Sequence, residues 1–370
     1  MIKFRPRNRP GGTRHRPLRA VAAGLAVAGM LAAGGSLAAA ASTTATASVR
    51  PAGGTADCDS LTTCYTPRQL QVAYGLRPLL ARGIDGRGQT VVLPELAEPR
   101  LSPPAVSDLR QDLAQFDRLF GLPAARLRVV TRLAGSAAPW LANGEEVLDA
   151  EMAHAIAPGA AITVVLVKAT SLNNTANALA AADPLVLAAG GSGLTASHQT
   201  GAYIRETAWG LPYGTPGSAF QASGGGFSRL FARPRYQDGV AGIGATRAVP
   251  DVAADASGHT GMALAISEGG SKVYIRNSGG TSASAPFWAA LIALADQYAH
   301  RHLGFVNPAL YRITRSGSYH GAFHDITSGN NTVKFPPKTF AGYRAAPGWD
   351  PVTGWGSPDA RVLVPLLAAL

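Results

Sequence analysis

The stretch Ser278–Pro286 reads SGGTSASAP, and an apolar run, Phe287–Ala295, follows it. Its two glycines allow a tight backbone turn, and a hydroxyl residue directly before an apolar run is typical of a helix N-cap. We therefore expect Thr281 or Ser282 to cap a helix. Free backbone N–H groups and the helix dipole would then favour negative charge that develops at Ser282, as an acyl-transfer nucleophile requires. An ordinary loop-to-helix cap is the alternative.

A second segment, residues 143–159, has the pattern of a helix. Because residues three or four positions apart share a helix face, Glu145 and Asp149 fall among apolar residues that should face the core. Like charges one turn apart repel, and burial raises that cost. The sequence therefore predicts a functional carboxylate pair, with solvated carboxylates above an apolar face as the alternative. Glu146 and Glu151 lie on other faces and are expected to contact solvent.

Short apolar runs alternate with helical periodicity along the chain. Strands are expected at residues 89–93, 126–131, 161–167 and 185–189, helices at 107–121 and 171–182, and a hairpin at 262–276. This alternation predicts an α/β fold with a parallel sheet and crossover helices. A glycine-rich segment, residues 190–193, is expected to follow the last of these strands.

Two further features indicate ligands. The turn formed by Gly224, Gly225 and Gly226 permits close approach of a substrate or of another strand, with simple turn use as the alternative. Two acidic loops, residues 323–331 and 345–351, combine carboxylates with small residues and free carbonyl groups. Such loops suit a hard cation such as Ca²⁺, although Asx-turns explain the same composition.

The N-terminal segment, residues 1–47, has the pattern of a secretory signal. Residues 1–48 hold seven of the eleven net positive charges and no acidic residue, and an apolar run, Val21–Ala41, leads to a small-residue cleavage site at residues 45–47. The basic charge therefore belongs to a leader, and no nucleic-acid partner is expected. Without a twin-arginine pair, general secretion to the extracellular space is predicted, with an uncleaved membrane anchor as the alternative.

The two cysteines of the chain, Cys58 and Cys64, are separated by five residues. Export makes a small-loop disulfide plausible, and two free thiols are the alternative. Without clustered histidines the pair does not make a zinc site. Residues 48–64 are therefore predicted to be a spacer with a disulfide loop, and residues 65–370 the main domain.

The motifs that the sequence lacks argue against several classes of enzyme. The chain has no G-x-S-x-G elbow, no H-E-x-x-H zinc motif and no phosphate-binding loop, which argues against α/β-hydrolases, zincins and nucleotide-binding enzymes. A nucleophilic serine still requires a base. No histidine lies in a segment expected beside Ser282, so a carboxylate with a pKa raised by burial is the candidate, and Glu145 and Asp149 supply two.

Seven motifs in order carry a family resemblance: TPxQLxxAYG from Thr66, GExxLD from Gly144, GGGxS from Gly224, VPDVA from Val249, GGTSxSAP from Gly279, FHDIT from Phe323 and PGWDPxTGxGSP from Pro347. Together they resemble the sedolisin (serine-carboxyl) peptidases, with the kumamolisin-like pattern the nearest. The resemblance implies a subtilisin-like parallel sheet flanked by helices. It also implies a monomeric secreted endopeptidase that acts on protein or peptide substrates at acidic pH, with no stable membrane partner once the signal is cleaved.

The resemblance also assigns roles to residues. Ser282 corresponds to the nucleophile, Glu145 to the general base and acid, and Asp149 to the carboxylate that orients Glu145. One structural Ca²⁺ is implied, and its ligands correspond to the side chains of Asp325 and Asp350 and to the backbone oxygens of Ile326, Ala346 and Gly348.

The chain departs from the family pattern in two places. The family has a long pro-domain, for which only the spacer before Cys58 leaves room here. An S-W-G strand and an A-G-D-S-G turn, whose Asp stabilises the oxyanion, are also missing; if residues 189–193 are aligned with that turn, Gly191 replaces the Asp. The fold is therefore expected to lack one or more family strands. A catalytically impaired binding protein and a gene-model deletion are the alternatives to an active peptidase.

Overall fold

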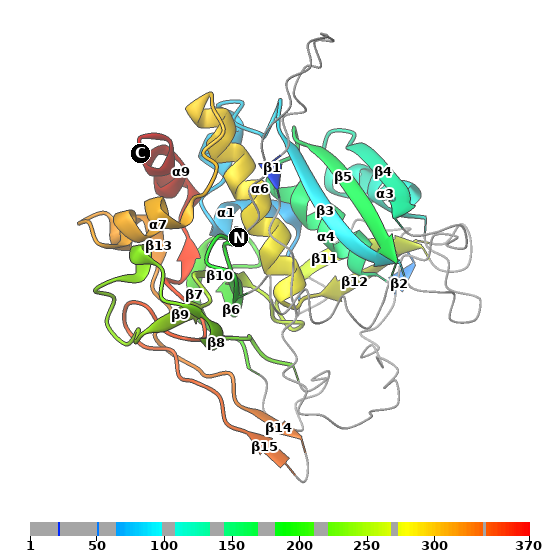
Figure 1. Ribbon diagram of the computed structural model, residues 1–370. Coiled ribbons are helices and arrows are strands. Elements are labelled where there is room, and N and C mark those ends of the chain that lie inside the picture. Colours follow the sequence, from blue (N-terminus) through cyan, green and yellow to red (C-terminus); the bar gives the residue numbers. More distant parts are fainter. Residues whose placement is uncertain are drawn as a thin grey trace, which may run out of the picture.

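A computed structural model gives the structure of the chain (Figure 1) and describes residues 21–22, 50–51, 64–97, 108–133, 144–168, 182–210, 221–267, 273–335 and 338–370. Most of the predicted signal and all of the spacer before Cys64, apart from residues 50–51, lie outside the described residues. The helix expected at residues 171–182 lies outside them as well, except for Ala182.

The first group of strands is a four-stranded parallel sheet. Its order is β1-β3-β5-β4, with bounds Val21–Ala22, Thr90–Ala97, Ala161–Lys168 and Arg126–Leu133. The strands expected at residues 89–93, 126–131 and 161–167 are thereby confirmed. Their β-branched and aliphatic residues suit a sheet that is covered on its faces.

The second group contains the glycine-rich segment. Its order is β10-β6-β7, with bounds Val252–Asp255, Ala189–Ala196 and Tyr203–Ala208. Strands β10 and β6 are parallel, and β6 and β7 are antiparallel. Among the described residues no ladder of hydrogen bonds joins this group to the first one.

The strand predicted at residues 185–189 is wrong. The segment after Asp183 turns, because the carboxylate of Asp183 accepts a hydrogen bond from the backbone N–H of Leu185 at 2.7 Å. The strand begins instead at Ala189, so the glycines expected to follow it lie inside it. Glycine is required at Gly190, where a Cβ would lie 2.7 Å from the carbonyl oxygen of Val352.

The central helix is α6 (Thr281–Ala299), which Figure 1 shows in yellow. It packs against α4 (Glu145–Ile156), α9 (Ala360–Ala368) and the strands β3, β6 and β10, and so contacts both groups of strands. The other helices are α1 (Pro67–Ala73), α2 (Arg77–Ala81), α3 (Leu109–Phe120), α4 (Glu145–Ile156), α7 (Asn307–Thr314), α8 (Tyr319–Ala322) and α9 (Ala360–Ala368), with a 3₁₀ turn η1 (Arg235–Gln237). No helix of the described residues has the length and apolar character needed to cross a bilayer.

Small antiparallel units complete the fold. The hairpin of β11 (Met262–Ser267) and β12 (Val273–Ser278), which leads to α6, confirms the one expected at residues 262–276. The units are β2 (Arg50–Pro51) with β12 (Val273–Ser278) and β11 (Met262–Ser267), β8 (Gly226–Ala232) with β9 (Thr246–Val249), β13 (Phe323–His324) with β16 (Ser357–Pro358), and β14 (Val333–Phe335) with β15 (Lys338–Phe340). Figure 1 shows the β14–β15 hairpin projecting from the body of the molecule.

Candidate active site

Ser282 lies in the first turn of α6. The N-cap is Gly280, whose φ of 102° belongs to the region that favours glycine, and the helix begins at Thr281. The expectation that Thr281 or Ser282 caps the helix is therefore wrong, because the glycine turn carries the chain into the helix one residue earlier. Ser282 is the second helical residue and its side chain is 8% exposed. Its hydroxyl thus stays near the free N–H groups of the helix start.

Glu145 is the first residue of α4, directly after Gly144, whose φ is 96°. Helices α4 and α6 pack together, and their first turns meet at these two residues. A hydrogen bond joins the side chains of Ser282 and Glu145. Burial raises the pKa of Glu145, and the hydrogen bond that Ser282 donates opposes this rise. The structure therefore brings together two residues that are 137 positions apart in the sequence.

Asp149 lies one turn further along α4 and is 5% exposed. Burial raises its pKa well above the ordinary value, and the charges of Glu95 and Glu145 raise it further. The carboxyl group of Asp149 is hydrogen-bonded to that of Glu95. Two carboxyl groups bond in this way only when one of them carries a proton, and the pKa shifts make Asp149 the donor.

Glu95 on β3 is a residue that the sequence analysis missed. Its side chain is 6% exposed, and burial raises its pKa to about 8. The hydrogen bond from Asp149 lowers that pKa, whereas the charges of Glu145 and Glu146 raise it. The only signal in the sequence is a carboxylate inside an otherwise apolar strand, TVVLPELA. A charged residue at such a position is rare unless it has a partner, which could have marked it.

The expectation that Glu146 and Glu151 contact solvent is wrong. Glu146 is 5% exposed and Glu151 is fully buried. The cause is that α3, α6, β3 and β11 all pack against α4, so this helix has no solvent face. Glu151 accepts a hydrogen bond of 3.0 Å from the backbone N–H of Ala265. Burial, with Asp112 and Asp117 nearby, raises its pKa well above the ordinary value.

Gly191 lies beside the start of α6, at the position that one alignment gives to the oxyanion Asp. A Cβ at Gly191 would lie 2.6 Å from the Cβ of Ala256, 2.9 Å from the indole of Trp209 and 3.6 Å from the methyl group of Thr281. The site is therefore filled by neighbours and has no space for a larger side chain. The hydroxyl of the next residue, Ser192, is buried and donates a hydrogen bond of 2.6 Å to Glu206.

The glycine turn at residues 224–226 approaches a neighbouring loop. A Cβ at Gly225 would collide with the carbonyl oxygen of Pro351, and one at Gly226 would lie 3.2 Å from the ring of Tyr343. At Gly224 no atom lies within 4 Å of such a Cβ. Close approach of another part of the chain thus explains two of the three glycines, and Gly224 has open space beside it.

The two acidic loops near the C-terminus meet. Asp325 accepts a hydrogen bond of 2.9 Å from the N–H of Gly348, and Asp350 accepts one of 3.4 Å from the N–H of Ala346. One oxygen of Asp325, Oδ1, is buried and has no hydrogen-bond partner among the described residues. Asp350 also accepts hydrogen bonds within its own loop, as Asx-turns do.

These loops fit the implied calcium shell in part. The orphaned Oδ1 of Asp325 is a hard oxygen donor that lacks a partner, and the backbone of Ala346 and Gly348 lies next to the two carboxylates. The described residues contain no cluster of three or more His, Cys, Asp or Glu side chains around a metal position. A cation here would therefore depend on backbone oxygens, among them that of the buried Ile326.

Cys64 is fully buried beside Tyr65, whereas Cys58 lies outside the described residues. The Cys58–Cys64 disulfide therefore stays a prediction.

Comparisons with known proteins find peptidases with similar sequences. Kumamolisin from Bacillus sp. (strain MN-32) is 41% identical over 195 residues, which are 50% of this chain and 32% of that protein. Sedolisin from Pseudomonas sp. (strain 101) is 36% identical over 183 residues, 50% of this chain and 29% of that protein. Tripeptidyl-peptidase 1 from Homo sapiens is 33% identical over 166 residues, which are 39% of this chain and 27% of that protein. The chain thus spans about a third of the length of the curated relatives it matches. No family model matches.

A solved structure shows the same fold. Pseudomonas sedolisin, described as a serine-carboxyl proteinase in complex with pseudo-iodotyrostatin, superposes with a TM-score of 0.66 and 23% identity. The match covers 83% of this chain and 98% of that one. The fold is therefore the predicted α/β fold with a parallel sheet and flanking helices. Together with the sequence relatives, this fold shows that the chain is similar to the sedolisin peptidases.

Proposed function

We propose that this chain is a secreted serine-type endopeptidase that hydrolyses peptide bonds in unfolded proteins, with Ser282 as nucleophile. The relatives named kumamolisin, sedolisin and tripeptidyl-peptidase support a peptidase with protein or peptide substrates. The observation that carries the proposal is the hydrogen bond from Ser282 to Glu145, at the edge of a buried group of carboxyl side chains that includes Asp149 and Glu95.

The geometry supports a two-step acyl transfer. The Oγ of Ser282 attacks the carbonyl carbon of the scissile bond while its proton passes to the carboxylate of Glu145. Glu145 then gives this proton to the leaving amine, the C–N bond breaks, and an acyl ester remains on Ser282. A water molecule, deprotonated by Glu145, hydrolyses the ester and restores the hydroxyl of Ser282. Because Glu145 exchanges protons in both steps, its position is the central requirement.

Acidic pH suits this arrangement. The hydrogen bond between Asp149 and Glu95 requires a proton, and a second negative charge within this buried pair would repel both the first and that of Glu145. The proton that the pair shares keeps Asp149 neutral and in place along α4. At higher pH, loss of the proton shared by Asp149 and Glu95 would add negative charge beside Glu145. Activity is therefore expected to fall as this pair ionises.

A structural Ca²⁺ belongs to the proposal. The side chains of Asp325 and Asp350 and the backbone oxygens of Ile326, Ala346 and Gly348 would hold it, and its chemistry would be to cross-link two loops. Asp325 Oδ1, buried and unpartnered within the described part of the chain, supports this assignment. Cleavage of a signal after Ala47, a Cys58–Cys64 disulfide and a monomeric state complete the proposal.

A second candidate is a peptide-binding protein with impaired catalysis. Gly191 favours it, because no carboxyl group is present at this position and Ala256 and Trp209 fill the space. Loss of one oxyanion donor costs about 10²–10³ in rate in a subtilisin variant, which gives the scale expected here. A chain of this kind would still bind peptide beside Ser282.

Hydrolysis of a denatured protein across acid to neutral pH tests the proposal. Wild-type chain should cleave it, and Ser282→Ala should reduce the rate by at least about 10³-fold. Ser284→Ala is the matched control, since Ser284 is buried two residues further along α6 and its hydroxyl has no partner among the described residues. Equal cleavage by wild type and Ser282→Ala would overturn the proposal. A folded wild type that binds peptide without cleaving it would favour the second candidate.

A further inference from the structure

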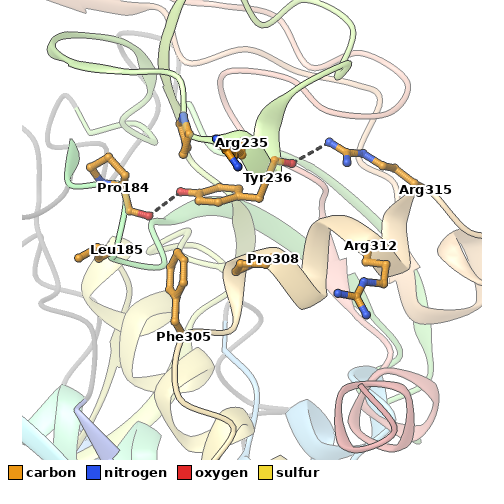
Figure 2. Close-up of a pocket in the computed structure, with 9 residues that line it drawn as sticks. Pro184, Leu185, Arg235, Tyr236, Phe305, Pro308, Arg312 and Arg315 are labelled. Carbon is orange, nitrogen blue, oxygen red and sulfur yellow. Dashed lines mark hydrogen bonds between the residues drawn. The ribbon is translucent and has the colours of Figure 1, made fainter.

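A surface cavity of about 540 Å³ lies apart from the residues proposed for catalysis (Figure 2). Three elements form it: the turn before β6, the 3₁₀ turn η1 and the helix α7. Figure 2 shows Pro184, Leu185 and Phe305 together at one side and Arg312 and Arg315 at the other. The cavity therefore has an apolar end and a cationic end.

The apolar end is exposed to an unusual degree. Leu185 is 73% exposed and Phe305 is 41% exposed, although both are large apolar side chains. Two such side chains at one cavity leave apolar surface in water, which a bound partner would cover. Because they remain so open, the cavity does not enclose a ligand as a typical small-molecule site does. An extended segment of a larger molecule, lying across the opening, fits this shape better.

Two of the lining arginines, Arg312 at the cationic end and Arg235 above Tyr236, have donors that are not engaged (Figure 2). The guanidinium groups of Arg235 and Arg312 have no hydrogen bond or ion pair within the described part of the chain, and no acidic side chain lines the cavity. Arg315 differs, because its guanidinium donates to the carbonyl oxygens of Tyr236 at 2.7 Å and Asp238 at 2.6 Å. Its charge is thus held at the rim while the other two arginines can turn towards an incoming carboxylate.

Tyr236 lies between the two ends of the cavity, and hydrogen bonds hold it in place. The hydroxyl of Tyr236 donates to the carbonyl oxygen of Pro184 at 2.7 Å and accepts a hydrogen bond of 3.2 Å from Asn307. The guanidinium carbon of Arg247 lies 5.6 Å from the centre of the Tyr236 ring, and Arg247 forms a buried ion pair with Asp251. A preformed surface of this kind binds without paying for its own ordering.

From these observations we infer that the cavity is a docking site for a peptide segment that carries a large apolar side chain followed by acidic side chains. The apolar side chain would lie on Leu185 and Phe305, and the carboxylates would bind Arg312 and Arg235. Tyrosine, phenylalanine and arginine are residues on which peptide and protein recognition commonly depends. The inference does not depend on the proposed catalysis, because it concerns a different surface.

Fluorescence anisotropy with a labelled peptide tests the inference. The protein carries Ser282→Ala, so that cleavage cannot affect the result, and the probes are the peptides FLAEEA and FLAQQA, labelled at the N-terminus. FLAEEA should bind, FLAQQA should bind at least about tenfold more weakly, and added salt should weaken FLAEEA. Arg312→Gln and Leu185→Ala should each weaken FLAEEA by about tenfold.

Arg68→Gln is the matched control. Arg68 is exposed on α1, away from the cavity, and the substitution removes the same charge. It should leave the affinity for FLAEEA within about twofold. Equal effects of Arg68→Gln and Arg312→Gln would overturn the inference, as would equal binding of both peptides or no binding up to about 1 mM. Thermal melting of each variant separates a binding loss from a folding loss, and Leu185→Ala changes a side chain too exposed to affect folding.

Discussion

The hydroxyl of Ser282 donates a hydrogen bond to the carboxylate of Glu145, where the first turns of α6 and α4 meet. Glycines with positive φ, Gly280 and Gly144, precede both helices and set where each begins. The bond therefore depends on two loop-to-helix turns as much as on the two side chains. Burial raises the pKa of Glu145, so its carboxylate, when ionised, is a stronger base for the serine proton.

Glu145→Gln should abolish hydrolysis, and Glu146→Gln should not. Glutamine keeps the size of the side chain but cannot take the proton of Ser282, so the rate should fall by at least about 10³-fold at every pH. Glu146 is the matched control because it is buried on the same helix turn. Its substitution should change the rate by less than about tenfold. Steady-state kinetics on a denatured protein checks both, and a larger loss in Glu146→Gln would reverse the assignment of the base.

The buried carboxyl groups predict that the folded state is most stable in acid. Burial raises the pKa of Glu95 from its ordinary value to about 8 in the folded state. A pKa raised by folding means that the folded state binds the proton more tightly, so the stabilisation is complete below the ordinary pKa and is lost as pH rises towards about 8. The free energy of unfolding, measured in urea, should fall by on the order of 2–4 kcal/mol between about pH 5 and about pH 8.

Glu95→Gln should reduce this pH dependence, since glutamine does not titrate. Asp238→Asn is the control, because Asp238 is exposed and its ion pair with Arg233 is open to solvent. It should leave the slope of stability against pH unchanged. An unaltered slope in Glu95→Gln would show that the buried pair is not its origin.

The parts of the site that the sequence predicted are those that local spacing determines. Glu145 and Asp149 are one helical turn apart, and the glycines before Ser282 signal a tight turn, so both features could be identified without a structure. Burial of Glu146 and Glu151 could not, because it depends on elements distant in sequence that enclose α4 on every side. Glu95 was missed for the same reason: its partner, Asp149, lies on another element.

The start of β6 shows a second reason why part of the fold could not be predicted from the sequence. An apolar run at residues 185–189 has the composition of a strand, yet a side-chain hydrogen bond to the backbone of Leu185 turns it. The true strand contains Gly190, Gly191 and Gly193, residues that a propensity argument excludes from strands. At Gly190 and Gly191 neighbouring groups approach the backbone closely, which only the packed structure reveals.

Gly191→Ala should destabilise the fold more than Gly193→Ala does. Both residues lie in β6, but a Cβ at Gly191 would lie 2.6 Å from the Cβ of Ala256, whereas the nearest atom to a Cβ at Gly193 is 3.5 Å away. Overpacking of this kind costs about 1–3 kcal/mol. Urea denaturation of the two variants measures the difference. Equal stabilities would mean that space exists at Gly191, and Gly191→Asp would then be worth testing as a replacement for the oxyanion carboxyl group.

Calcium should raise the melting temperature of the wild-type chain, and a chelator should lower it. Binding to the folded state alone stabilises it by about 2.7 kcal/mol at a calcium concentration 100 times Kd, which corresponds to an increase of several degrees, roughly 5 °C or more. The effect should disappear in Asp325→Asn, because the amide removes the negative charge from the buried Oδ1 position.

Asp238→Asn serves again as the control for calcium, since it removes one carboxylate at an exposed position far in sequence from both acidic loops. Its melting temperature should respond to calcium as that of the wild type does. A calcium response that persists in Asp325→Asn would place the ion elsewhere, and no response in the wild type would mean that hydrogen bonds alone hold the two loops. In that case Asp325→Asn should cost only about 1–2 kcal/mol, the value of the hydrogen bond with Gly348. Calorimetric melting with and without calcium separates these outcomes, because it reports the stability of the loops whether or not the chain cleaves peptides.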